Sequence, residues 1–224
     1  MRMNDILSPL QRAFLQAFFA VPVGQRFFLT GGTALSAFHL HHRLSDDLDL
    51  FTLDDEALGA TIHPVEAIAD DLGCALRRTR VSQYFQQLFL SHPQIEEPLK
   101  IDMVRDFGPQ YGERLVRDGM IVDALDNIAA NKVCALFGRA SIKDFVDLYF
   151  ILQEGYELDE LFEMAREKDL GLTKFYFVGM LRQIGRHTYL PKMLKPLELE
   201  TLQTFYSEMA YGLMRDIDPE QRNW

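Results

Sequence analysis

Cysteine is scarce in this chain of 224 residues, and long apolar runs are missing from it. The two cysteines, Cys74 and Cys134, fall within apolar patterns, so we expect buried free thiols in a reducing cytosol and no disulfide framework. No apolar run approaches the roughly 20 residues that a membrane helix needs. Met1–Asp5 lacks the apolar core of a secretory signal. These absences predict a cytoplasmic protein without a membrane partner.

Positive charge is also in short supply. The net charge of −10 opposes nucleic-acid binding by the chain as a whole. The segment Leu170–Leu197 differs, because it has no acidic residue and mixes basic with aromatic side chains. Such a segment can contact a polyanion, although a solvated helix face over core aromatics has the same composition. Its basic and aromatic residues are Lys174, Phe175, Tyr176, Phe177, Arg182, Arg186, Tyr189, Lys192 and Lys195.

Hydrophobic periodicity changes near residue 122. Before it, strand-like stretches alternate with amphipathic ones, and beyond it the period is helical throughout. We therefore predict an α+β protein: a mixed sheet with flanking helices in residues 1–122, and a helical C-terminal bundle in residues 123–224 that completes the active site. The expected helices are 9–20, 33–42, 64–72, 124–137, 142–153, 157–168, 173–186 and 197–214; the expected strands are 26–30, 47–51, 74–80, 84–90 and 99–104, with a hairpin over 115–122.

Two acids lie two positions apart in the second predicted strand. Asp47 and Asp49 project to one face because side chains alternate along a strand. Neighbouring carboxylates repel unless a cation lies between them, and Mg²⁺ prefers such hard oxygen ligands. Asp102 interrupts an apolar strand, and on a strand beside the first pair it would complete a site for two metals about 4 Å apart. The alternative for the pair is an exposed strand end. The alternative for Asp102 is a strand-end position with an ion pair to Arg105 or to another basic residue.

A glycine pair follows the first predicted strand. Without Cβ atoms, the backbone of Gly31 and Gly32 can approach a phosphate closely, and the next helix offers free N–H groups. Thr33 can cap that helix or donate to phosphate, and Ser36 lies one turn further on. A simple turn would also explain the pair, and neither the P-loop nor the Rossmann pattern occurs.

These motifs together resemble a known family. Gly31-Gly32-Thr33-Ala34-Leu35, followed by Arg43-x-Ser45-x-Asp47-x-Asp49-Leu50, is similar to the AbiEii-type nucleotidyltransferases, the toxins of type IV toxin–antitoxin systems. That family belongs to the polymerase-beta-like nucleotidyltransferase superfamily. Asn131-Lys132-x-x-Ala135-Leu136-x-x-Arg139 and Lys143-Asp144-x-x-Asp147-Leu148 resemble its later motifs. The resemblance covers roughly residues 25–150.

The resemblance implies a nucleotidyltransferase-like mixed sheet and the transfer of NMP from an NTP to an acceptor. It implies Mg²⁺ or Mn²⁺ as cofactor and a cognate antitoxin as partner, and it favours tRNA as the acceptor. The composition of Leu170–Leu197 makes that segment the place where we expect the RNA to bind. The implied metal ligands are Asp47, Asp49 and Asp102, which with Lys132 form the catalytic set. The implied nucleotide-binding residues are Gly31, Gly32, Thr33, Ser36, Arg43, Ser45, Lys132, Asp144 and Asp147, with the choice between the last two acids open.

The later motifs have a physical reading of their own. Lys132 falls on an apolar helix stripe, so its ammonium needs an anion, which can be a triphosphate, Asp144 or Asp147, unless its stem reaches solvent. A histidine cluster ends the helix after the glycine pair, where the helix dipole also favours it, and we predict that it binds no zinc. The cluster is His39, His41 and His42.

Two other functions fit the sequence. The same site can modify a protein or a small molecule, which the acidic net charge favours. A chain that binds nucleotides without turnover, as a regulator or as half of a complex, would also keep these motifs. The acceptor and the base of the triphosphate are left open.

Overall fold

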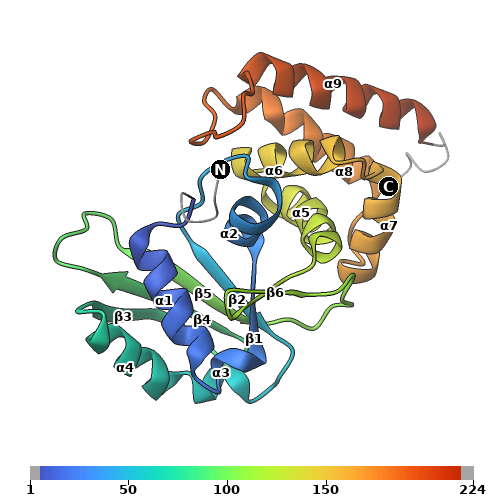
Figure 1. The fold of residues 1–224 in the computed structure, drawn as a ribbon. Helices are drawn as coiled ribbons and strands as arrows, with labels where there is room; N and C mark the ends of the chain where they lie inside the picture. The colour runs from blue at the N-terminus through green and yellow to red at the C-terminus, as the bar shows by residue number, and fades with distance from the viewer. Residues whose placement is uncertain (1–5, 218–224) are drawn as a thin grey trace. The chain divides into compact units, whose positions relative to one another are not determined.

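The computed structural model describes residues 6–217, which divide into two compact units, up to residue 125 and from residue 126 onward. The first unit contains a mixed sheet with flanking helices, and the second is helical (Figure 1). The α+β fold predicted from the sequence is therefore confirmed. Since each unit is compact by itself, each is described separately.

The sheet of the first unit has seven strands in the order β3-β4-β5-β2-β1-β7-β6. The pairs β2–β5 and β1–β7 are parallel, and every other neighbouring pair is antiparallel. The central strands are therefore contributed by distant parts of the chain. The strands are β1 Phe27–Thr30, β2 Leu48–Thr52, β3 Ala75–Val81, β4 Phe85–Ser91, β5 Leu99–Arg105, β6 Leu115–Arg117 and β7 Met120–Val122.

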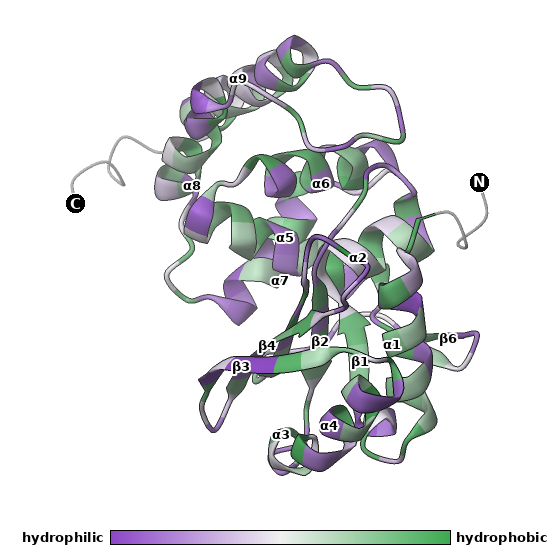
Figure 2. Cartoon of the chain, turned by 90° about the vertical axis from the view of Figure 1, so that its left-hand side faces the viewer, coloured by the Kyte–Doolittle hydropathy of each residue, from purple (hydrophilic) through white to green (hydrophobic). Residues whose placement is uncertain are grey.

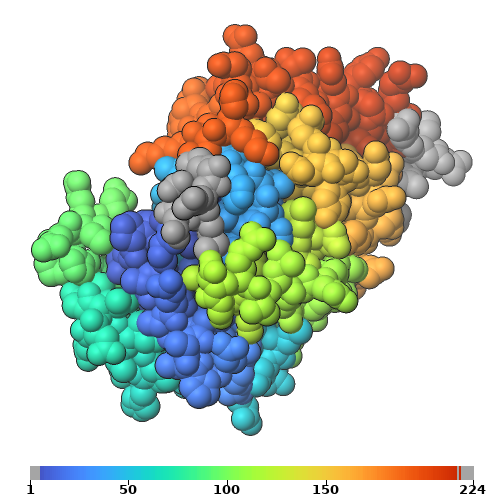
Figure 3. All heavy atoms as spheres, viewed as in Figure 1, coloured from blue at the N-terminus to red at the C-terminus, as the bar shows by residue number. Residues whose placement is uncertain are grey.

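Burial distinguishes the central strands from the edge. All four residues of β1 are buried, whereas β2 and β5 alternate between buried and half-buried positions. Strand β3 lies at the sheet edge, is mostly exposed and carries three arginines, and it shows purple bands in Figure 2, where β1 is green. The loop between β4 and β5 extends at the left of the space-filling view (Figure 3). The charged edge limits pairing with a further strand.

The helices of the first unit begin with α1, Pro9–Ala20. Ser8 caps it in a reciprocal capping box with Gln11, and Pro9 is its first residue, so the helix predicted over 9–20 is confirmed. After β1 the chain forms α2, Gly31–Ala34, which continues as the wider turn η3, Leu35–Leu40. The remaining helical segments are η2 Gly24–Arg26, α3 Ala57–Ala60 and α4 Ile62–Asp71.

A tight hairpin joins β6 to β7. Asp118 and Gly119 form its turn with φ values of 53° and 79°, as a type I′ connection requires. The predicted hairpin is confirmed, and its second strand pairs with β1 through Leu29 and Val122.

The second unit consists of five helices and one 3₁₀ turn within its described residues. Ser141 caps α6 and Thr173 caps α8, each by accepting a backbone N–H. Tyr206 is buried and donates to the carbonyl of Phe145 at 2.7 Å, which fixes α9 against α6. No helix within residues 6–217 has the length and apolarity to cross a membrane. The helices are α5 Leu125–Arg139, α6 Ile142–Gln153, α7 Leu158–Lys168, α8 Lys174–Leu181, the 3₁₀ turn η4 Arg182–Arg186, and α9 Leu199–Asp216.

Candidate active site

Parallel pairing of β2 with β5 brings two predicted carboxylates together. Asp49 lies directly opposite Asp102 in the register of these strands. Both residues occupy the half-buried positions of their strands, so their side chains share one face of the sheet. The prediction that Asp102 lies on a strand beside the first acids is confirmed. Of the alternative ion pairs predicted for Asp102, the one with Arg105 is not formed, because Arg105 binds Asp55 at 2.7 Å. The one with another basic residue is formed, with Lys100.

A lysine lies among these carboxylates. Lys100 Nζ is 2.7 Å from Asp102 Oδ2 and 3.7 Å from Asp47 Oδ2. Gln87 donates to the other oxygen of Asp102 at 3.1 Å. Partial desolvation lowers the pKa of Lys100, but the hydrogen bond to Asp102 and the charges of Asp47, Asp102 and Asp49 raise it by more. Asp47 and Asp102 thus share the ammonium group of Lys100.

The donor set fits a hard divalent cation. Three carboxylates are the ligands that Mg²⁺ and Mn²⁺ prefer, and the ammonium of Lys100 shows that a cation is stabilised between two of them. Within residues 6–217, no three side chains already converge on one point as metal ligands. Binding a metal therefore requires side-chain movement, with Asp47, Asp49 and Asp102 as the residues that would hold it.

The glycine pair makes room for this cluster. Gly31 has φ +68°, and a Cβ there would lie 2.0 Å from Asp49 Oδ2. A Cβ on Gly32 would lie 2.6 Å from Arg43 Nη2 and 2.9 Å from Ser45 Oγ. The space beside both glycines is thus filled by side chains of the predicted site. From the sequence we expected a phosphate to approach the glycines, and the side chains beside them were not predicted.

The segment before β2 is fixed from two sides. Thr33 Oγ1 donates to the carbonyl of Asp47 at 2.5 Å, and Gln11 Nε2 donates to the carbonyl of Ser45 at 2.8 Å. Arg43 is buried and donates to the carbonyl of Leu44 at 2.8 Å. Helices α1 and α2 therefore hold the loop that presents the acids.

Ser36 occupies a different environment from the other predicted residues. It is fully buried, and its hydroxyl has no hydrogen-bond partner in the described part of the chain. The structure places Gly31 beside Asp49, and Gly32 beside Arg43 and Ser45. Ser36 is a buried residue of η3, and its hydroxyl forms no hydrogen bond with any of these described side chains. Its role in nucleotide binding stays a prediction.

Asp123 is a buried acid to which sequence reasoning gave no role. Thr30 Oγ1 donates to its Oδ2 at 2.6 Å, and the N–H of Asp123 donates to the carbonyl of Leu29 at 2.9 Å. His39 Nε2 lies 3.0 Å from the carbonyl of Asp123, and His41 Nδ1 lies 2.9 Å from that of Ser36. The carboxylate fixes the end of β1, directly before the glycine pair. The position of Asp123 directly after an apolar strand is the feature of the sequence that could have indicated this role.

The second unit encloses a separate network of charges around Lys132. Its Nζ lies 2.7 Å from Asp147 Oδ2 and 3.4 Å from Asp144 Oδ1, and all three side chains are buried. Of the anions that the sequence allowed, the two acids are therefore the partners observed. Asp144 also accepts from Arg139 Nε and from Ser141 Oγ, each at 2.7 Å.

The two acids differ in their surroundings. Burial alone raises the pKa of Asp144, but the hydrogen bond from Arg139, the charges of Lys132 and Arg139, and the hydroxyl of Ser141 lower it overall. Asp144 thus ties the end of α5 to the start of α6. Asp147 makes the shorter contact with Lys132.

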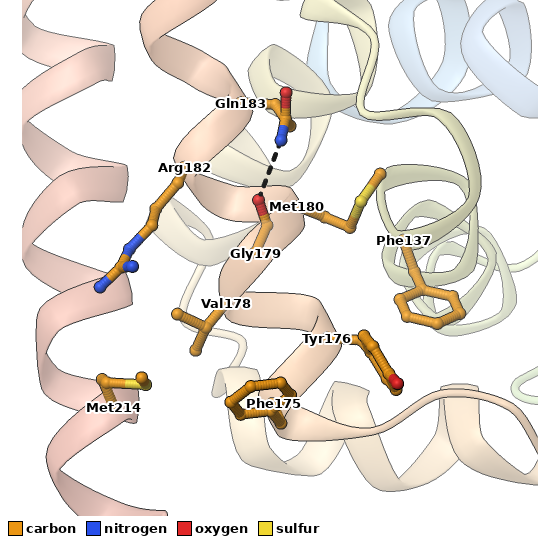
Figure 4. A pocket seen from close by; sticks show the side chains of 9 residues that line it. All are labelled: Phe137, Phe175, Tyr176, Val178, Gly179, Met180, Arg182, Gln183 and Met214. Atoms are coloured by element: carbon orange, nitrogen blue, oxygen red, sulfur yellow. Dashed lines mark hydrogen bonds between the residues drawn. The ribbon is translucent and has the colours of Figure 1, made fainter. Parts of the chain in front are cut away.

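A pocket of about 420 Å³ lies in the predicted acceptor segment of the second unit (Figure 4). Phe175 and Tyr176 lie at its wall with partly exposed rings, and the 3₁₀ turn after α8 contributes Arg182. The other lining residues are Phe137, Val178, Gly179, Met180, Gln183 and Met214.

The basic charge of this segment is partly neutralised. Lys174 pairs with Asp159 at 2.6 Å and Lys195 with Glu154 at 3.6 Å. Arg182, Arg186 and Lys192 form no ion pair with any described residue. The positive patch is therefore smaller than the composition indicated.

Comparison with known proteins agrees with this fold. The sequence model described as "Nucleotidyl transferase AbiEii toxin, Type IV TA system" matches residues 13–219. The protein is thus a nucleotidyltransferase. The chain belongs to the AbiEii toxin family of type IV toxin–antitoxin systems, which implies an NTP substrate and an antitoxin partner.

Individual relatives are distant. An uncharacterized protein of Aquifex aeolicus (strain VF5) is 28% identical over 170 residues, which cover 70% of this chain and 73% of that protein. The crystal structure of JHP933 from Helicobacter pylori superposes with a TM-score of 0.59 at 21% identity, covering 95% of this chain and 92% of that one. MenT4, a nucleotidyltransferase toxin from Mycobacterium tuberculosis H37Rv, gives a TM-score of 0.51 at 15% identity, covering 96% and 85%. At these identities the two structures support the fold.

Proposed function

We propose that this toxin is a metal-dependent enzyme that transfers NMP from an NTP to tRNA. The observation that carries the proposal is the cross-strand alignment of Asp49 with Asp102, with Asp47 brought to them by a shared lysine. Such an arrangement of carboxylates suits a site for divalent cations and a triphosphate. The two free cysteines suit the reducing cytoplasm, where both substrates occur.

The reaction is an in-line displacement at the α-phosphorus. A hydroxyl oxygen of the acceptor forms a bond to that phosphorus, the bond to the bridging oxygen of the β-phosphate breaks, and pyrophosphate leaves. Asp102 takes the proton of the attacking hydroxyl. Bound Mg²⁺ or Mn²⁺ supplies neutralisation of the triphosphate charge and activation of the hydroxyl. Positioning by the chain provides much of the remaining rate.

The nucleotide is bound next to the glycine pair in this proposal. Ser45 and Arg43 lie against Gly32, so a small movement of either brings a hydroxyl or a guanidinium to a phosphate. Thr33 contributes indirectly, since its hydroxyl holds the backbone of Asp47. Lys132, Asp144 and Asp147 keep a predicted role in nucleotide binding, which Lys132→Met tests by its effect on the Michaelis constant for NTP.

The acceptor contacts the segment Leu170–Leu197. Arg182, Arg186 and Lys192 supply positive charge, while Phe175 and Tyr176 offer aromatic faces beside the pocket in Figure 4. Stacking on aromatic rings and pairing with phosphates are how proteins bind unpaired RNA. The free ends and loops of tRNA present such bases.

Label transfer tests the function directly. The protein is incubated with Mg²⁺, α-labelled NTP and total tRNA, and the RNA and protein fractions are counted separately. We expect label in RNA that ribonuclease removes, and its loss in Asp47→Ala and Asp49→Ala. Asp70→Ala, which removes an exposed acid of α4, is the control and should retain activity. Full activity in both site variants overturns the proposal.

The same experiment separates the alternative acceptor. Label that resists ribonuclease and remains with protein would establish modification of a protein, which the net charge of −10 favours over RNA. Binding of NTP without label in any fraction would indicate a regulator.

A further inference from the structure

Lys100 is distinguished by its position in both sequence and structure. It is the only lysine in residues 1–125. It lies two positions before Asp102 on β5, on the same face of the sheet as Asp102 and its cross-strand neighbour Asp49. Neither the family motifs quoted above nor the proposed chemistry gives this residue a role.

The contacts of Lys100 are those of a cation bound by carboxylates. Its ammonium is 2.7 Å from Asp102 and 3.7 Å from Asp47, and Asp49 acts on it through its charge. The next basic residue on the strand, Arg105, is engaged by Asp55. Lys100 is therefore a positive charge that lowers the repulsion between Asp47 and Asp102 in the metal-free protein.

We infer that Lys100 is a built-in counter-ion of the carboxylate cluster, which a divalent cation must displace from Asp102 and Asp47 in order to bind. The inference rests on the proposed function, because it takes the cluster to be the metal site. A divalent ion and an ammonium repel each other at such distances, so both cannot share the same carboxylate oxygens.

When a divalent cation displaces the ammonium of Lys100 from the carboxylates, this group must move to a second position. Its backbone is held in β5 between β4 and β2, so the released ammonium stays beside the site and can bind a phosphate oxygen of the incoming triphosphate. Metal and nucleotide should then bind cooperatively, because the nucleotide accepts the charge that the metal releases.

Titration with Mn²⁺ alone, followed by electron paramagnetic resonance, tests the inference without a turnover assay. Lys100→Met removes the competing charge and should bind Mn²⁺ about tenfold more tightly than the wild type. Its metal-free form should melt at a lower temperature, and Mn²⁺ should raise that temperature by more than in the wild type. Arg117→Met, which removes an exposed cation from β6, should bind Mn²⁺ within about twofold of the wild type. Lys100→Gln carries the same prediction if Lys100→Met does not fold.

Cooperativity is measured by repeating the titration with a non-hydrolysable ATP analogue. The analogue should tighten Mn²⁺ binding more in the wild type than in Lys100→Met. Equal or weaker Mn²⁺ binding by both Lys100 variants overturns the inference. If the Lys100 variants bind Mn²⁺ no more tightly but Asp102→Asn binds it more weakly, the inference about Lys100 fails and the proposed metal site is retained. If neither the wild type nor any variant binds Mn²⁺, the proposed metal site and the inference both fail.

Discussion

Two lysines of this protein are each held by two aspartates, one in each unit, and they differ in burial. Around Lys100 the side chains of the lysine, Asp47 and Asp102 are 29%, 44% and 16% exposed. Around Lys132 the side chains of the lysine, Asp144 and Asp147 are 7%, 0% and 0% exposed. Water and ions reach the first group and not the second. The ion pairs around Lys100 can therefore be replaced by other ions, whereas those around Lys132 serve to stabilise the fold.

Energetics explain the difference. A partly exposed pair is screened by water and contributes about 0–1 kcal/mol, so replacing its cation costs little. Removing one member of a buried pair leaves an uncompensated charge and costs about 3–5 kcal/mol. We therefore predict that changes at the first group alter activity with little loss of stability, and that changes at the second lower stability whatever their effect on nucleotide binding.

The largest expected effect is on catalysis. Asp49→Ala should lower the rate of label transfer by about a thousandfold, because the lost ligand contributes several kcal/mol to charge stabilisation in the transition state. The free energy of unfolding in urea should change by less than about 1 kcal/mol, since the residue is half-buried. If Asp49→Ala lost stability but its folded fraction transferred label at the wild-type rate, Asp49 would be a structural residue and not a catalytic one.

Asp147→Asn should have the opposite profile. The buried ammonium of Lys132 loses its nearest carboxylate, so we expect a loss of about 3–5 kcal/mol in the free energy of unfolding. Urea denaturation measures it, with Glu163→Gln on the exposed face of α7 as the control for a surface ion pair. Equal stability of Asp147→Asn and this control would show that burial does not govern the network.

Gly31→Ala tests the fit between the glycine pair and the acids. The new Cβ would displace Asp49, so Mn²⁺ affinity should fall about tenfold or more, whereas the unfavourable φ costs about 1–2 kcal/mol of stability. Gly73→Ala is a matched control, because Gly73 has φ +65° and open space around it. Its stability should fall similarly, with Mn²⁺ affinity retained. Loss of affinity in both variants would assign the effect to general destabilisation.

The smallest expected effect is a pH dependence in the second unit. The pKa of Asp144 is lowered by folding from its ordinary value of 3.8. The stability that this residue contributes is therefore present above pH 3.8 and is lost as the pH falls through the lower value of the folded state. The difference in unfolding free energy between the wild type and Asp144→Asn should shrink over that range. A difference that grows with acid would contradict the assigned direction.

Much of the fold was predictable because local signals were strong. Ser8 and Pro9 define the start of α1, Ser141 defines that of α6, and Asp118-Gly119 defines the hairpin turn. The short helix α3 had no cap or clear period and was missed. The predicted helix over 173–186 changes to a 3₁₀ turn at Arg182. The hydrophobic periodicity of this segment does not indicate that change.

The acids of the candidate site could be singled out from the sequence, but their contacts in the structure could not. Alternation along strands placed Asp47 and Asp49 on one face, and the burial cost of a lone carboxylate singled out Asp102. The strand order that sets Asp49 opposite Asp102 depends on long-range pairing, which no local pattern encodes. The roles of Lys100 and Asp123 likewise emerge only when β5, β2, β1 and β7 are assembled.

Crystals soaked with Mn²⁺ and a non-hydrolysable triphosphate test the central claim most directly, through the anomalous signal of manganese. The account predicts a peak bounded by Asp47, Asp49 and Asp102, with Lys100 Nζ moved away from Asp102. A peak at another site, with the Lys100–Asp102 ion pair still closed, would contradict it.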